Sequence, residues 1–357
     1  MTLNKAFAAE RKKPRPLKSS VNGKKMVQFL ADIIDQLDTA IDQLAVSDRN
    51  FDRFAIMLID NVVELTLYRY AQDKNSENKM WSWNKEKPPK YDPKALEKAL
   101  GKRFDAKVKF AVKTGLIKET EGISLLNLHS FRNTAHHRGL HHEGILHSIA
   151  HFYFQNSCNL LIHYSPMWWS SGSNDSISHR AVKYIGKVDF LSSKEAFDNA
   201  WHRLNDVSIS MKSDLIGDLH KDMKNTISST DEMIQFLAND APTKSTRDQV
   251  IIDSQAWPFA FTDKAKEFAQ VNGYSDSNSL NIVEWIGLNY PWQIKSDPIA
   301  SWRNRLNSLH SETHLHNALK KYCDFMTQTE DIRSKIYEAA AQLDAHIQQE
   351  IDRMRGK

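Results

Sequence analysis

Residues 27–44 read VQFLADIIDQLDTAIDQL, and their apolar positions recur at alternating steps of three and four. This spacing places one stripe of apolar side chains along an α-helix. The stripe consists of Val27, Leu30, Ile34, Leu37, Ile41 and Leu44. The same period returns at the other end of the chain, from Ile336 to Met354. The pattern predicts a mostly helical protein whose helices bury one face each.

The composition agrees with an all-α fold. Only 12 glycines and 10 prolines occur in 357 residues, too few for a sandwich, barrel or propeller, which need frequent turns. A hydrophobic content of 41% suffices for packed cores and argues against a disordered chain. The two cysteines cannot form a disulfide framework, and no apolar run approaches a membrane span. With no signal peptide visible, we expect a soluble protein of the cytoplasm.

Five helices are expected in the first half of the chain. Ser47 or Asp48 can cap the second of them, which should end near Tyr70, and residues 73–92 read as a polar loop. Asp92 and Pro93 open a third helix. The expected ranges are about 24–46, 48–70, 92–115, 124–138 and 142–164. Short connections between them predict a compact bundle.

We divide the chain into a helical bundle at 24–169, a linker at 170–192 and a helical C-terminal region at 193–357. The linker begins with a serine-rich stretch, and 179–190 could hold a short strand. In the C-terminal region a long helical stretch covers 193–239, and Thr327 with Glu330 resembles a capping box. Residues 1–23 form a basic arm, which suits a polyanion partner or is simply a solvated terminus.

One segment carries recognisable chemistry: residues 130–139, which read SFRNTAHHRG. Arg132 offers a planar cation that matches phosphate oxygens, and His137 can gain and lose a proton near neutral pH. Asn133 lies four residues before His137, on the same helix face. Arg132 and His137 lie about 140° apart around an ideal helix, so a long side chain or a looser turn must bring them together. The residue types suggest attack of a ribose 2′-hydroxyl on the adjacent phosphorus, with no metal required.

The sequence from Arg132 to His137, Arg-Asn-x-x-x-His, resembles the motif of the HEPN superfamily. The resemblance covers roughly residues 24–165, and it implies a helical bundle with Arg132 and His137 as catalytic residues and Asn133 as an orienting residue. HEPN proteins are commonly metal-independent endoribonucleases of toxin–antitoxin, abortive-infection and CRISPR systems, and they act as dimers. The resemblance therefore implies an RNA substrate, a 2′,3′-cyclic phosphate product, no cofactor, a homodimer and a possible antitoxin or regulatory protein.

A second Arg/His set occurs near the other end of the chain. Arg303 precedes His310 by seven residues, and Arg305 precedes it by five. A seven-residue step brings two side chains to nearly one helix face. These residues could form a second HEPN-like unit, but such pairs are ordinary on exposed helices, and we leave them out of the expected catalytic set.

Two other function classes remain open. Six histidines crowd residues 136–151, and His147 and His151 with Glu143 could bind zinc, as in a metal-dependent hydrolase. The chain could instead be a catalytically silent helical module that binds RNA or protein. Asp60 and Glu64 lie on an otherwise apolar helix. They either face solvent or are buried, in which case Arg132 or a histidine could be their partner.

Overall fold

The computed structural model describes residues 26–81, 88–137, 143–171, 176–186, 193–211, 213–241, 244–274 and 279–356, without the side chains at 134–137, 143, 279 and 280. Every regular element within these ranges is helical, and no strand occurs in them. The expected all-α fold is confirmed. The basic arm at 1–23 lies outside the described residues.

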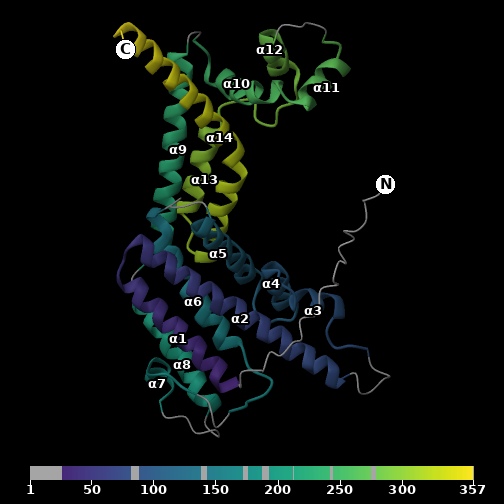
Figure 1. Cartoon of the computed structure of the whole chain (residues 1–357), viewed down its shortest axis with the longest axis vertical. Coiled ribbons are helices and arrows are strands. Elements are labelled where there is room, and N and C mark those ends of the chain that lie inside the picture. Colours follow the sequence, from purple (N-terminus) through teal and green to yellow (C-terminus); the bar gives the residue numbers. More distant parts are fainter. Residues whose placement is uncertain are drawn as a thin grey trace, which may run out of the picture.

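Four long helices lie side by side in one body of the molecule (Figure 1). They are α1 (Met26–Ala45), α2 (Arg49–Trp81), α6 (Leu146–His163) and α8 (Ser193–Ser210). A short helix, α7 (His179–Ile185), packs against α1 and α8. The stripe expected on α1 is the buried one, since Leu30, Ile34 and Leu37 are at most 1% exposed.

Three further helices and one short 3₁₀ turn complete this body. They are α3 (Pro93–Ala99), α4 (Phe104–Lys113), α5 (Glu119–His137) and η1 (Glu143–Ile145). Both α4 and α5 pack on α2, and α5 also contacts α6. The helix expected over 92–115 is thus two helices, separated at Leu100–Arg103.

A second body rises from the first (Figure 1). Its helices are α9 (Leu215–Asp240), α13 (Ile299–His310) and α14 (Leu315–Met354), with α10 (Arg247–Ala260), α11 (Asp263–Val271) and α12 (Ser279–Asn289) projecting to one side. Because α14 contacts α5 and α9 contacts α6, one hydrophobic core continues from Met26 to Ile336. A small separate core holds α10–α12 together around Ile286 and Trp292.

Some expected boundaries are wrong, each for a physical reason. Helix α2 continues through the expected loop to Trp81, because its polar residues find distant partners: Tyr164 donates to Asp73 at 2.8 Å, and Asn78 donates to the Tyr91 carbonyl at 2.9 Å. Helix α14 begins at Leu315, so the expected capping box at Thr327 lies inside a helix.

The middle of the chain also differs from expectation. Residues 179–185 form α7 rather than a strand, with Ser178 as the N-cap. The stretch expected as one helix over 193–239 is two helices, α8 and α9, and Asp214 caps the second through the Gly217 amide. Helix α8 packs on α6, so it lies with the N-terminal bundle. No helix within the described ranges has the length and apolar character to cross a membrane.

Candidate functional site

Arg132 lies on α5 and faces α2. Its Nε is 3.5 Å from Oδ2 of Asp60, whose side chain is only 2% exposed. Its Nη1 donates a hydrogen bond of 3.0 Å to Oδ1 of the next residue, Asn133. The guanidinium therefore has an ion-pair contact to Asp60 and a hydrogen bond to Asn133, while 35% of its side chain remains exposed. Asn133 and Arg132, two of the expected site residues, do contact each other.

Asp60 is the centre of this cluster. Its Oδ1 is 2.8 Å from Nδ1 of His129 and accepts a hydrogen bond of 2.7 Å from the Tyr153 hydroxyl. Tyr153 is fully buried, and burial raises the pKa of its hydroxyl, which therefore remains a donor. The hypothesis that a buried Asp60 would take Arg132 or a histidine as partner is confirmed, and it takes both.

Glu64, one helical turn beyond Asp60, behaves differently. Its side chain is 38% exposed and lies 3.1 Å from Nζ of Lys107 on α4, a side chain that is only 3% exposed. Nζ of Lys107 also donates a hydrogen bond of 2.8 Å to the Gly101 carbonyl. Glu64 thus anchors α4 to α2 through Lys107.

The third expected site residue, His137, falls outside what the structure describes. Its backbone belongs to the last turn of α5, but the side chains of His136 and His137 and residues 138–142 lie outside the described residues. The expected convergence of Arg132 and His137 stays a prediction.

Two other histidines of the same region form a chain of contacts with an acid, in which Asp52 and His151 are buried and His147 is half-buried. Nδ1 of His147 lies 2.8 Å from Oδ1 of Asp52, and its Nε2 lies 3.0 Å from Nε2 of His151. The hydrogen bond to Asp52 raises the pKa of His147. Burial, helped by the neighbouring His147, lowers the pKa of His151 to about 4. Near neutral pH the His151 imidazole is therefore neutral, and the carboxylate of Asp52 favours the charged form of His147.

This arrangement bears on the zinc alternative. His147 is engaged by Asp52 and His151 by His147, and Glu143 has no described side chain. Within the described ranges, no three side chains of histidine, cysteine, aspartate or glutamate gather in a metal-binding arrangement. The alternative gains no support from the geometry.

The second Arg/His set has separate partners. Nη2 of Arg303 lies 2.6 Å from Oδ2 of Asp231, and the Arg305 guanidinium lies over the Phe325 ring at 5.1 Å. The His310 ring instead contacts the His220 ring, with 4.6 Å between centroids. Arg303 and Arg305 thus each contact a residue outside this set, and the second HEPN-like unit stays a prediction.

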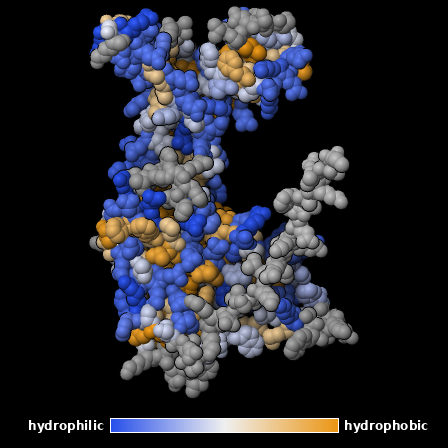
Figure 2. Space-filling view, in the orientation of Figure 1, coloured by the Kyte–Doolittle hydropathy of each residue, from blue (hydrophilic) through white to orange (hydrophobic). Residues whose placement is uncertain are grey.

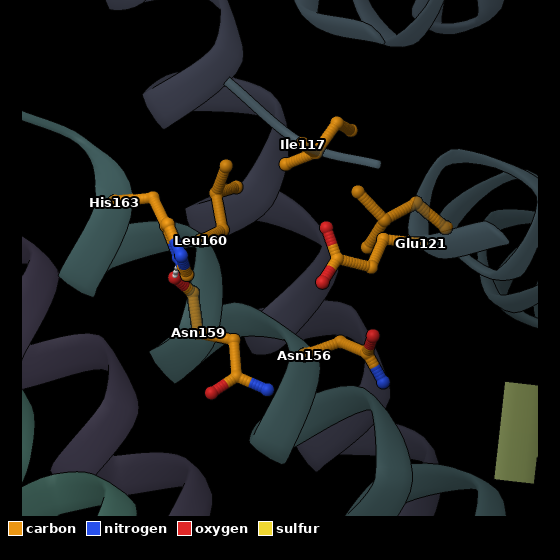
Figure 3. A pocket seen from close by; sticks show the side chains of 7 residues that line it. Ile117, Glu121, Asn156, Asn159, Leu160 and His163 are labelled. Atoms are coloured by element: carbon orange, nitrogen blue, oxygen red, sulfur yellow. Dashed lines mark hydrogen bonds between the residues drawn. The ribbon is translucent and has the colours of Figure 1, made fainter. Parts of the chain in front are cut away.

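A shallow depression lies between the start of α5 and the second half of α6. Glu121 of α5 lies across it from Asn156 and His163 of α6 (Figure 3). It is lined by Ile117, Glu121, Leu125, Asn156, Asn159, Leu160 and His163, which do not include Arg132, Asn133 or His129. The depression is therefore separate from the Asp60 cluster.

Sequence reasoning missed His129 and Tyr153. His129 could have been found, because it precedes Arg132 by three residues and shares its helix face. Tyr153 gives no local signal, since it lies in an apolar run of α6 and reaches Asp60 from 93 residues away.

Comparison with known proteins gives no independent identification. No family model matches the chain, and neither the curated proteins nor the solved structures contain a significant match.

Proposed function

We propose that the protein is a metal-independent endoribonuclease of the HEPN type. Arg132 and His137 would be the catalytic residues, and Asn133 would orient the site. The observation that carries the proposal is the position of Arg132: its guanidinium lies beside a buried carboxylate and donates to a neighbouring amide, yet a third of its side chain stays accessible.

The reaction makes specific demands on these residues. The ribose 2′-oxygen loses its proton and forms a bond to the adjacent phosphorus, while the bond from phosphorus to the 5′-oxygen breaks and that oxygen takes up a proton. The products are a 2′,3′-cyclic phosphate and a free 5′-hydroxyl. Arg132 would stabilise the negative charge that builds up on the non-bridging oxygens. His137 would move protons.

A fixed arginine suits this role better than a mobile one. An electrostatic group lowers a barrier most when it is oriented before the reaction begins, because no reorganisation is then needed. Asp60 supplies this orientation from α2 while being itself tied to α6 through Tyr153. Contacts from α5 and α6 therefore position the carboxylate beside which the Arg132 guanidinium lies.

A homodimer is part of the proposal. Exposed apolar side chains gather where α1 ends and α2 begins: Val46, Phe51, Phe54 and Met57. Figure 2 shows hydrophobic surface at this end of the body. Asp52, within the same turn of α2, bonds His147 at the start of α6, so the patch lies at the end of the bundle where α5 gives way to α6. A second copy covering it would bring the two motif segments near each other.

The dimer can be tested by the mass of the protein in solution. Phe54→Glu should convert a dimer to a monomer in light scattering, whereas Trp257→Glu, at an exposed aromatic residue of α10, should not. A wild-type protein that is monomeric at all concentrations would contradict this part of the proposal.

The activity is tested by RNA cleavage in excess EDTA. Wild type should cut, and Arg132→Ala and His137→Ala should each lose about 100-fold or more of the rate. Arg303→Ala and His310→Ala are matched controls from α13 and should retain it. Activity abolished by EDTA would favour the metal-dependent hydrolase. Binding without any cleavage would favour the silent module.

The wider setting rests on the resemblance alone. A role in antiviral defence or a toxin–antitoxin system, a cytoplasmic location and an antitoxin or regulatory partner belong to the proposal and follow from HEPN likeness.

A further inference from the structure

An imidazole, a carboxylate and a guanidinium meet where α5 packs on α2. His129 and Arg132 lie on either side of the Asp60 carboxylate, one at each oxygen. The His129 ring also stacks on Phe104 of α4, with 4.0 Å between ring centroids and 8° between the ring planes. The imidazole is thus fixed in position and in tilt, while 21% of its side chain remains exposed.

The contacts also fix which ring nitrogen of His129 carries the proton. An ionised carboxylate can only accept hydrogen bonds. Oδ1 of Asp60 accepts a hydrogen bond from the Tyr153 hydroxyl, and acting as acceptor again it takes a second one from Nδ1–H of His129. In the neutral ring the other nitrogen, Nε2, then has a free lone pair, as a general base requires.

Helix geometry makes His129 a closer neighbour of Arg132 than His137 is. Three residues separate His129 from Arg132, which corresponds to about 60° around the helix, whereas Arg132 and His137 lie about 140° apart. Arg132 also lies between the two histidines along the axis. A phosphate bound by Arg132 could therefore also meet the His129 imidazole.

We propose that His129 is a second proton-transfer residue of this site, oriented by the buried Asp60. The inference rests on the proposed ribonuclease function. Nε2 of His129 takes the 2′-hydroxyl proton as the new oxygen–phosphorus bond forms. His137 gives a proton to the 5′-oxygen as its bond to phosphorus breaks. His129 then releases its extra proton to water and His137 takes one up from water, so the protons balance over the cycle.

The surroundings of His129 suit this cycle. Asp60 on α2 stabilises the imidazolium that forms when Nε2 takes a proton. Arg132 on the same helix carries the opposing positive charge, and it shares the same carboxylate. Tyr153 on α6 contributes only a neutral hydroxyl, and the Glu64–Lys107 pair between α2 and α4 is internally balanced.

The decisive variant is His129→Asn. The asparagine amide can still donate to Asp60 where Nδ1 did, but it has no group in place of Nε2. We expect the cleavage rate to fall about 100-fold or more, and the acidic limb of the pH–rate profile to disappear. His163→Asn, at an exposed histidine of α6 that bonds the Asn159 carbonyl, is the control and should leave the rate and the profile unchanged.

A second variant covers the case in which His129→Asn fails to fold. His129→Ala leaves space for an imidazole molecule that can act as the missing base, so added imidazole should restore part of the cleavage rate. Added imidazole should not restore the cleavage rate of Arg132→Ala. Folding of each variant is checked by circular dichroism.

The outcomes separate this inference from the function on which it rests. If Arg132→Ala abolishes cleavage but His129→Asn keeps the wild-type rate and pH profile, His129 is only structural and the inference is wrong. If Arg132→Ala and His137→Ala both cleave like wild type, the proposed function itself is wrong. A folded His129→Ala that imidazole cannot rescue would also count against a proton-transfer role.

Discussion

The buried His151 gives a quantitative prediction about acid stability. His151 is 5% exposed, and burial lowers the pKa of its ring to about 4, against about 6.5 for an unperturbed histidine. The unfolded chain therefore binds a proton at His151 more readily than the folded protein does. Its contribution to stability is complete above about pH 6.5 and is lost as the pH falls toward 4.

The size of the loss follows from linkage. Between pH 7 and pH 5, a shift from about 6.5 to about 4 removes about 2 kcal/mol of unfolding free energy. His147 has the opposite sign, because Asp52 raises its pKa. The contribution of His147 to stability is complete below its pKa in the unfolded chain, and it is lost as the pH rises through its pKa in the folded protein. The change in the unfolding free energy of the wild type between pH 7 and pH 5 is thus the sum of the opposing His151 and His147 contributions.

Comparison with His151→Gln isolates the His151 contribution. Glutamine keeps a polar group beside His147 but cannot titrate, so the variant should lose about 2 kcal/mol less than wild type between pH 7 and pH 5. The free energy of unfolding is measured by urea denaturation at each pH, followed by tryptophan fluorescence. His163→Gln, on the same helix but exposed, serves as control and should behave like wild type. Equal losses in wild type and His151→Gln would refute the reasoning.

Three further predictions concern the interior around the site. Tyr153→Phe removes one of the donors to Asp60 and should lower the free energy of unfolding by about 2 kcal/mol in urea denaturation. Both Lys107→Ala and Lys107→Met leave Glu64 and the Gly101 carbonyl unpaired, but only Lys107→Ala also leaves a gap, so it should cost about 2 kcal/mol more than Lys107→Met; similar losses in both variants would contradict this. The Cys158 thiol is fully buried and burial raises its pKa, so mass spectrometry should find it unlabelled by maleimide at pH 7 until the protein unfolds.

The parts of the fold that local pattern determines were predictable. The stripe on α1 is buried as expected, because a three-and-four spacing of apolar residues leaves a helix only one face to bury. The extension of α2 to Trp81 was not predictable. Asp73 and Asn78 look like loop residues in sequence, and only their bonds to Tyr164 and Tyr91 make a helix favourable there.

The candidate site, too, could be predicted from the sequence only in part. Sequence reasoning placed Arg132 and Asn133 on a helix of the bundle and named Asp60 as a possible partner, and the structure joins all three. It did not name His129, although the spacing of three residues from Arg132 was available. Which acid pairs with which base depends on how α2 and α5 pack, and periodicity within one helix carries no information about that.

The most direct test of the proposed chemistry is the nature of the cut ends. An RNA oligonucleotide is incubated with wild type and with Arg132→Ala in excess EDTA, and the fragments are weighed by mass spectrometry. We predict 2′,3′-cyclic phosphate and 5′-hydroxyl ends from wild type alone, and no cut at a position where a single 2′-deoxy nucleotide removes the attacking hydroxyl. Fragments that end in a 3′-hydroxyl and a 5′-phosphate, or cleavage at the deoxy position, would contradict it.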